Sequence, residues 1–494
     1  MAHMDASGHT APNVALNSAT GRWVVFTTVL GSGMALLDGT VVNVALPRLG
    51  AELRADMAGL QWTVNAYTLT LAGLILLGGS LGDRYGRRRV FLVGVGWFAA
   101  ASALCGLAPS IEVLVAARAL QGVGGALLTP GSLAIIQASF ARADRPRAVG
   151  AWSGLGGVAA AVGPLLGGWL VQSAGWRWVF WINVPIAALV IVTAVRHVPE
   201  SRDTTTTGRF DVLGAAVAAL ALAGLTFGLI ETGPALVAAA AGLALGAAFA
   251  VLQVRRSRPG GRVAALVPVE MFRSRVFTAV NTVTLIMYAA MGVVFFLLVL
   301  QLQVAAGFAP IAAGSALLPV TLLMLALSAP AGALAARIGP RAPMTAGIAL
   351  AAAGFVVLSR IGPGTSYLTG VLPGVALFGL GISAAVAPLT ATVLASVADR
   401  HAGVASGVNN AVARAGGLLA VAAVPPLVGL TGAAYASPYA FTAGYQRAML
   451  VCAAMMAVAA LVAFRTVRGD ILGAPQPEPH PHCGVNAPPL EPPG

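Results

Sequence analysis

Long apolar stretches follow one another along this chain, separated by short polar segments. An α-helix of about 20 apolar residues is long enough to cross the hydrocarbon core of a bilayer. The chain has 494 residues, of which 58% are hydrophobic and 9% are charged, and its mean hydropathy is +0.86. A soluble helical protein would need many more charged residues to cover its surface. The sequence therefore predicts an all-α integral membrane protein.

Fourteen stretches are long and apolar enough to be membrane spans. Residues 1–22 are polar and small and lack the apolar core of a cleaved signal peptide, so we expect the first span to be retained. The Pro-rich segment 468–494 is expected to be disordered. The predicted spans fall near 23–46, 62–81, 90–108, 111–138, 148–171, 178–196, 212–231, 235–253, 277–301, 310–335, 342–360, 367–395, 403–430 and 446–465.

Arginine accounts for every basic residue of the chain, since the sequence contains no lysine. With the N-terminus in the cytoplasm, 22 of the 29 arginines fall at cytoplasmic ends and loops, 5 fall on the other side and two lie inside spans. Membrane proteins carry an excess of basic residues in their cytoplasmic loops. We therefore predict a multi-pass protein of the cell membrane with both termini in the cytoplasm. The net charge of +13 then reflects topology, and no nucleic-acid partner is expected.

The densest group of charges, "GGSLGDRYGRRR" at 78–89, separates the second and third predicted spans. This loop resembles the one between helices 2 and 3 of the major facilitator superfamily. In that family the loop is a gating latch whose aspartate meets the N-terminus of a helix in the other half of the molecule. A carboxylate gains about 0.3–1 kcal/mol in such a position, which is weak enough to break during a transport cycle. The residues that match the latch are Gly79, Asp83, Arg84, Gly86 and Arg88.

Two pairs of similar segments indicate that the second half of the chain is an internal duplication of the first. The segment 332–341 repeats the glycines and arginines of the latch loop at a shift of 253 residues, and 398–406 repeats 143–151 at a shift of 255. Secondary transporters often place such repeats around a central site. We therefore predict a major facilitator fold with two pseudo-symmetric six-helix bundles and two inserted helices. The boundaries are 1–22 for the N-terminal tail, 23–197 for the first bundle, 198–254 for the linker and inserted helices, 255–276 for a cytoplasmic loop, 277–467 for the second bundle and 468–494 for the tail.

Two charged side chains lie deep inside predicted spans. Asp38 is in the first span, where burial favours the neutral form of a carboxyl group, and Arg118 is in the fourth, where insertion costs about 2.5–3.5 kcal/mol. If Arg118 approaches Asp38, the opposite charge favours the ionised form, so a change in this neighbourhood would let Asp38 take up and release a proton. The structural alternatives are an Asp38 satisfied by nearby Thr and Asn side chains, and an Arg118 that reaches for the membrane interface.

The stretch around Asp38 resembles a motif of the fourteen-helix drug:proton antiporters within this superfamily. The segment from Arg118 to Gln121 resembles the family's pattern in the fourth span, which is tied to proton transfer in relatives. The resemblance extends over about residues 20–467 and implies that Asp38 and Arg118 couple transport to protons. The matched positions of the first motif are Leu37, Asp38, Thr40, Asn43, Ala45 and Pro47.

The fifth span, "GAWSGLGGVAAAVGPLLGGWL", carries small residues at helical spacing along two stripes. Small residues let helix backbones approach closely in lipid, and a proline favours a bend. Close packing is the structural interpretation. The end of the span also resembles the antiporter signature of the family, which is associated with exporters, although Ala159 stands where the pattern has a glycine. The matching residues are Gly163, Pro164, Gly167 and Gly168.

Nothing in the sequence indicates a catalytic, nucleotide or metal site. A phosphate-binding loop of the Walker type needs a lysine, so ATP does not drive transport through this chain. The three cysteines Cys105, Cys452 and Cys483 lack the spacing of a metal site. We therefore expect no enzyme activity and no cofactor, with the proton gradient as the energy source.

These features predict a proton-coupled antiporter that exports amphipathic or cationic organic compounds, either drugs or an endogenous antibiotic, by alternating access. The alternatives are a dedicated exporter of one secondary metabolite, an importer or symporter, and a membrane sensor that has the fold but does not transport. The expected partners are a small-molecule substrate, protons and the lipid bilayer, and the expected state is a monomer. Glu231, at the outer end of the seventh span, is expected to be interfacial rather than part of the coupling site.

Overall fold

The computed structural model describes residues 14–141, 144–202, 211–231, 235–257, 263, 265–398, 402–432 and 437–472. The predicted disorder of the C-terminal tail falls almost entirely on residues outside these ranges. The described chain is helical throughout, apart from one isolated bridge between Val14 and Phe140. Its helices are α1 Ala19–Glu52, α2 Met57–Tyr85, α3 Arg87–Gly106, α4 Ile111–Ser139, α5 Arg145–Ser173, α6 Trp178–Trp181, α7 Asn183–His197, α8 Val212–Ile230, α9 Ala235–Arg256, η1 Val269–Arg273, α10 Arg275–Val304, α11 Pro310–Ser315, α12 Leu318–Ile338, α13 Arg341–Leu358, η2 Tyr367–Val371, α14 Leu372–Ala395, α15 Ala402–Leu427 and α16 Pro438–Thr466.

The described residues contain twelve helices that are long and apolar enough to cross a membrane. Helix α2 makes a thirteenth if its two parts, which meet at an angle of 50°, belong to one span. The predicted span at 148–171 lies within α5, a helix of 29 residues that is not among the twelve. The prediction of an all-helical, multi-pass membrane protein is therefore confirmed, whereas the number of fourteen spans is not.

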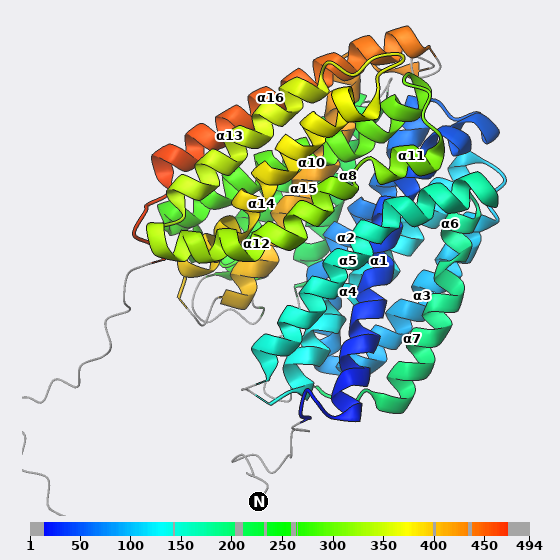
Figure 1. Cartoon of the computed structure of the whole chain (residues 1–494). Helices are drawn as coiled ribbons and strands as arrows, with labels where there is room; N and C mark the ends of the chain where they lie inside the picture. The colour runs from blue at the N-terminus through cyan, green and yellow to red at the C-terminus, as the bar shows by residue number, and fades with distance from the viewer. Residues whose placement is uncertain are drawn as a thin grey trace, which may run out of the picture.

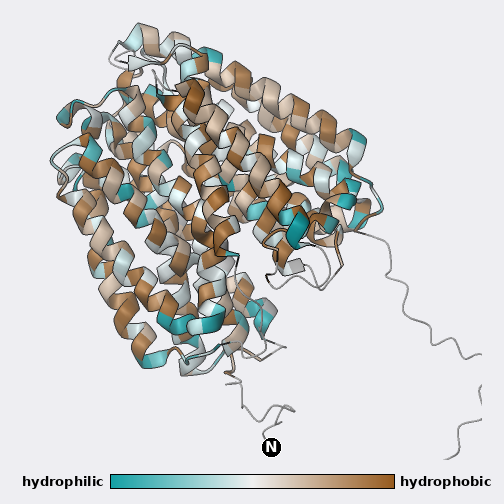
Figure 2. Cartoon of the chain, turned by 180° about the vertical axis from the view of Figure 1, so that it is seen from behind, coloured by the Kyte–Doolittle hydropathy of each residue, from teal (hydrophilic) through white to brown (hydrophobic). Residues whose placement is uncertain are grey.

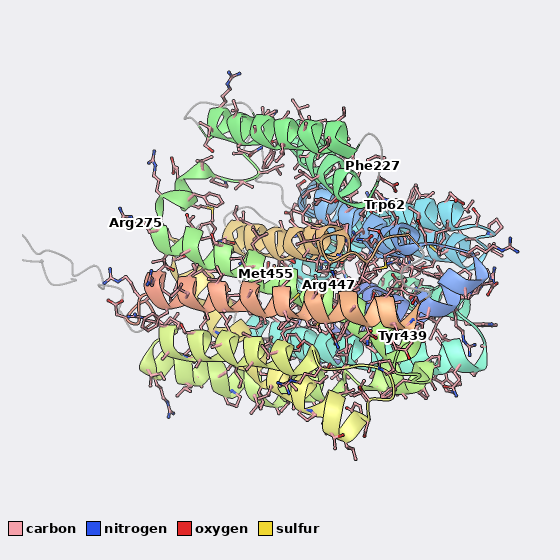
Figure 3. The ribbon with its side chains drawn as sticks, turned by 90° about the horizontal axis from the view of Figure 1, so that it is seen from above. Trp62, Phe227, Arg275, Tyr439, Arg447 and Met455 are labelled. Atoms are coloured by element: carbon pink, nitrogen blue, oxygen red, sulfur yellow. The ribbon has the colours of Figure 1, made fainter. Side chains whose placement is uncertain are left out.

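The helices form two groups that lie side by side (Figure 1). Helices α1 to α7 pack mainly on one another, and so do α10 and α12 to α16, whereas the short helix α11 packs mainly on α5. We assign α11 to the second group because it lies between α10 and α12 in the chain. We call these groups the first and the second bundle. Helices α8 and α9 form a pair outside both, and α8 lies against α2 of the first bundle and α15 of the second. Figure 3 shows Phe227 of α8 beside Trp62 of α2, with 6.2 Å between their ring centroids.

Apolar side chains dominate the middle of the helices, and hydrophilic ones gather at their ends (Figure 2). This distribution is the one that a bilayer imposes, because its hydrocarbon core offers no hydrogen bonds. One end of the molecule carries the start of α1, the end of α2 with Arg84, and the start of α3 with Arg87, Arg88 and Arg89. We call it the basic end.

The two bundles are joined at the end opposite the basic end. Gln61, near the start of α2, donates to the carbonyl oxygens of Val421 (2.6 Å) and Ala422 (3.1 Å) of α15. Gln303 of α10 donates to the carbonyl oxygen of Val44, near the end of α1, at 3.0 Å. Within the described residues these are the hydrogen bonds between the bundles. The helices of the two bundles spread apart toward the basic end (Figure 1).

Glycines of α5 allow a close backbone contact at this joined end. A Cβ atom on Gly168 would lie 2.5 Å from Cα of Ile311 and 2.6 Å from the carbonyl oxygen of Pro310, which begins α11. Within the first bundle, a Cβ atom on Gly163 would lie 2.2 Å from Oγ1 of Thr40. By contrast, a Cβ atom on Gly154 would meet nothing within 4 Å. Of the α5 glycines that the structure describes, the closely packed ones lie toward the C-terminal end of the helix.

The close contact at Gly168 predicts that a large side chain disturbs the packing of α5 at this position but not at Gly154. Gly168→Leu should push α5 away from α11, since overpacking costs about 1–3 kcal/mol and the atoms in the way belong to the backbone. We expect the distance between spin labels at Ser173 and Ala309, in nanodiscs, to become longer and broader. Gly154→Leu makes the same substitution in open space, so it should leave the distance unchanged. Equal distances in both variants would contradict a close contact at Gly168.

Candidate functional site

The carboxylate of Asp38 is completely enclosed at the middle of α1, with no exposed surface. Its Oδ2 atom accepts a hydrogen bond from Nη1 of Arg118, with which it forms a buried ion pair. Its Oδ1 atom accepts from Nε2 of Gln121 (2.8 Å) and from Nδ2 of Asn183 (3.1 Å). The predicted pair of Asp38 and Arg118 is thus brought into direct contact, with two amide groups around it.

The guanidinium of Arg118 is enclosed as well, with 1% of the side chain exposed. Its Nε donates to the carbonyl oxygen of Thr63 at 3.0 Å, and its Nη1 also donates to Oε1 of Gln121 at 2.6 Å. The ring of Tyr67 faces the guanidinium, with its centroid 4.4 Å from the Cζ atom. Arg118 therefore does not reach for the membrane interface, and the alternative of a snorkelling side chain does not apply.

A second layer fixes the two amides. Ser102 of α3 accepts hydrogen bonds from Gln121 (2.5 Å) and Asn183 (3.1 Å). The thiol of Cys105 lies 3.7 Å from Oε1 of Gln121. The network therefore draws on α1, α2, α3, α4 and α7, which all belong to the first bundle.

The carboxylate of Asp38 accepts hydrogen bonds from three donors, one of which is a cation. The approach of Arg118 to Asp38 that the sequence analysis considered is therefore present in this structure. Removing one partner of a buried ion pair costs about 3–5 kcal/mol, since the other charge then lacks compensation. Each member of this pair therefore depends on the other to remain enclosed in the first bundle.

Two residues of the latch loop, Asp83 and Arg87, contact each other within the first bundle. Asp83 accepts a hydrogen bond from Nε of Arg87 at 2.9 Å and forms an ion pair with the same side chain. Both side chains are partly exposed, and the pair links the last turn of α2 to the first residue of α3 across Gly86. Among the described residues, Asp83 makes no hydrogen bond or ion pair with a helix of the other half, so the expected docking is not seen there. This difference follows from the spread of the bundles at the basic end.

Glu200, which follows α7, holds the start of α3 and was not singled out by the sequence analysis. Its two carboxylate oxygens accept the backbone N–H groups of Arg88 (3.1 Å) and Arg89 (3.2 Å). Gly86 has a φ of +109°, and a Cβ atom there would lie 2.8 Å from Oε1 of Glu200. Gly86 is therefore required both by its backbone conformation and by the carboxylate beside it. No local sequence pattern indicates Glu200, because its partners lie more than a hundred residues earlier.

Other predicted or overlooked residues lie away from the Asp38 network. Glu231 follows α8 and accepts a hydrogen bond from Nε1 of Trp62 at 2.7 Å, so it ties α8 to the first bundle. Asp211, at the start of α8, is buried and accepts from Nε2 of Gln253 (2.7 Å), which links α8 to α9. The sequence analysis missed Asp211 because it lies just before an apolar span.

The cysteines take no part in a metal site within the described residues. Cys105 and Cys452 are buried and free. Cys483 lies outside the described part of the chain. Among the residues that the structure describes, no group of three or more His, Cys, Asp and Glu side chains could hold a metal ion.

Comparison of the sequence with known families and proteins gives consistent matches. The family model of the Major Facilitator Superfamily matches residues 28–421. A probable actinorhodin transporter of Streptomyces coelicolor is 37% identical over 83% of this chain and 73% of its own length. The tetracenomycin C resistance and export protein of Streptomyces glaucescens is 34% identical over 81% of this chain and 74% of its own length.

Solved transporter structures share the fold. A peptide transporter in complex with sulfate covers 93% of this chain and 98% of its own, with a TM-score of 0.67 and 15% identity. A second structure is a bacterial homologue of the human lysosomal transporter Spinster, in an inward-facing and unoccupied conformation. It covers 91% of this chain and 97% of its own, with a TM-score of 0.64 and 16% identity. At these identities the likeness concerns the fold alone. The family model and the curated relatives show that the chain belongs to the Major Facilitator Superfamily and is related to its antibiotic-resistance and multidrug exporters.

Proposed function

We propose that this protein exports amphipathic organic compounds across the cell membrane in exchange for protons, by alternating access. The observation that carries the proposal is the enclosed Asp38–Arg118 pair, the one titratable ion pair found deep within the spans of the described chain. Inserting an ionisable group at that depth of the membrane has a high free-energy cost, and such groups serve the transport of ions or protons in many membrane proteins. The relatives named above are a probable actinorhodin transporter and a tetracenomycin C resistance and export protein, which supports organic compounds as the cargo.

The proposed topology has fourteen spans, with α2 and α5 included, and the basic end in the cytoplasm. The excess of arginine in the loops of that end supports this orientation. The joined end, with Gln61, Gln303 and Gly168, then faces outward. In this orientation the hydrogen bonds between the bundles lie at the outer end, and the helices diverge toward the cytoplasm (Figure 1). This arrangement fits the state from which an exporter would load its cargo.

The proposed coupling acts through the packing of the first bundle. With Asp38 ionised, the amides of Gln121 and Asn183 converge on its carboxylate and keep α1, α4 and α7 together. A proton from outside would neutralise Asp38, so Arg118 would lose its counter-ion and the bundle would repack. Because the pair is enclosed here, the proton must reach it in a different conformation. Binding and release of the proton would thereby alternate with the two states of the transporter.

Antiport is favoured over import or symport by the end of α5. Gly163 and Gly167 lie against Thr40 and Val41 of α1, within one turn of Asp38. A repacking of the Asp38 network would therefore change how α5 packs on α1. Helix α5 also makes the contact with α11 at Gly168, on the proposed outer side. A sensor without transport would have no need of an enclosed titratable pair.

Replacing the carboxyl group of Asp38 tests the coupling. Asp38→Asn keeps the size of the side chain but cannot exchange a proton, so uphill accumulation of a fluorescent organic dye in proteoliposomes with a pH gradient should be lost. Downhill equilibration of the dye should persist. Glu112→Gln, which removes an exposed carboxylate in the first turn of α4, serves as the control and should accumulate dye normally. Uphill accumulation by Asp38→Asn at the wild-type level would mean that another group carries the proton.

The latch is proposed to act when the helices come together at the basic end, because Asp83 pairs here with its neighbour Arg87 and, among the described residues, with no cation of the second bundle. Asp83→Asn should therefore slow dye transport strongly while changing the melting temperature little, since an exposed ion pair contributes about 0–1 kcal/mol. Glu200→Ala should instead lower the melting temperature, because it removes the acceptor for two N–H groups of α3. Thermal unfolding in detergent and dye efflux distinguish the two roles. Normal transport by Asp83→Asn would refute the latch.

A further inference from the structure

Arg414 is a second arginine inside the spans, and neither the fold nor the proposed coupling accounts for it. It is the thirteenth of the 26 residues of α15, and so it lies at the middle of the helix. From that position the side chain is about two to three turns from either membrane interface, where an arginine is expensive. Within the described residues no ion pair includes Arg414, and its Nε donates a 3.2 Å hydrogen bond to Oδ1 of Asn410 in the same helix.

The position of Arg414 on α15 directs it toward the first bundle. Val421, whose carbonyl oxygen accepts from Gln61 of α2, follows Arg414 by about two helical turns, so both residues lie on one face of α15. The opposite face meets α10, where Asn409 donates to Oγ1 of Thr284 at 2.8 Å. Arg414 therefore lies where the two bundles face each other rather than inside the second bundle.

Two tyrosines lie on the helices that flank this arginine. Tyr67 belongs to α2 and Tyr288 to α10, and both helices pack against α15. A Cβ atom on Gly417, three residues after Arg414, would lie 3.6 Å from the carbonyl oxygen of Tyr288. The hydroxyl of Tyr67 donates to the carbonyl oxygen of Ala35, whereas no hydrogen bond of the Tyr288 hydroxyl is found among the described residues. Tyr67 also faces Arg118, so the space next to Arg414 adjoins the coupling network. A ligand there would meet a cation, a hydroxyl and aromatic rings.

The charges at this depth do not balance. Asp38 neutralises Arg118, and both are enclosed, so Arg414 contributes an uncompensated positive charge. A cationic compound beside it would be repelled in a region of low dielectric constant. An anionic group would supply the missing counter-ion and accept hydrogen bonds from the guanidinium. This balance opposes the cationic cargo that the sequence alone suggested.

We propose that Arg414 binds the acidic group of an aromatic organic anion, such as a carboxylate or an acidic phenol, and that such anions are the preferred cargo. The proposal rests on the export function proposed above and specifies its substrate class. The ring of Tyr288, which is partly exposed, would pack against the aromatic part of the cargo, while Arg414 holds its charge.

Two xanthene dyes of opposite charge test the proposal, namely fluorescein as the anion and rhodamine 123 as the cation. Proton-driven uptake of each dye is measured in proteoliposomes containing wild type, Arg414→Gln or Arg414→Lys. We expect wild type to prefer fluorescein, and Arg414→Gln to bind and transport it about ten- to hundredfold less well, as for the loss of a charge-assisted hydrogen bond. Rhodamine 123 should not be impaired by that change, and Arg414→Lys should retain part of the fluorescein transport.

Arg447→Gln is the matched control. It removes a positive charge from the same bundle, but Arg447 lies near the start of α16 and donates to the carbonyl oxygen of Ala443 in its own helix (Figure 3). The Arg447→Gln variant should prefer the same dye as wild type, to the same degree. A preference of wild type for rhodamine 123, or an equal loss of both dyes in Arg414→Gln, would overturn the anion site.

Equilibrium binding separates this proposal from the export function. Fluorescence polarisation of each dye with the purified protein needs no proton gradient. If wild type binds fluorescein through Arg414 but never accumulates either dye, the anion site stands and the proton-driven export proposal fails. If the protein shows no preference for fluorescein in binding or in transport, the anion site is refuted whether or not it pumps.

Discussion

The ion pair between Asp38 and Arg118 is the interaction on which the first bundle depends. Two charges removed from water inside apolar helices carry a large desolvation cost, and their mutual attraction offsets it only if the remaining hydrogen-bonding groups are satisfied. Gln121 and Asn183 satisfy the carboxylate, and Ser102 in turn receives hydrogen bonds from both amides. The polar residues of α3, α4 and α7 are therefore arranged around one carboxyl group of α1.

The same pair connects the chemistry of a proton with the shape of the molecule. Its neighbours in α1, Thr40 and Val41, pack on the glycines of α5, and α5 forms the close contact with α11 at the joined end. The basic end has no corresponding hydrogen bonds between the bundles within the described residues. A change of charge at Asp38 can thus affect one end of the molecule through a short series of packed helices.

The sequence predicted the features that depend on composition or on a strong local pattern. The apolar stretches predicted the helices, and the two deep charges predicted that Asp38 and Arg118 have a special role. The partners of these charges were harder to predict, since a single Asn183 or Ser102 in an apolar helix gives no sign of the direction in which it points. Glu200 and the Asp211–Gln253 contact depend on tertiary proximity, which one sequence does not contain. The latch prediction describes a closed basic end, whereas the structure has Asp83 paired with Arg87.

Release of a proton on substrate binding is the measurement that tests the coupling most directly. Purified protein in weakly buffered detergent solution is mixed with a transported dye, and a soluble pH indicator follows the protons released. If cargo binding favours the ionised Asp38–Arg118 pair, wild type should release protons at a pH at which Asp38 is partly protonated, and Asp38→Asn should release none. The same release from Asp38→Asn would contradict the account and place the proton elsewhere.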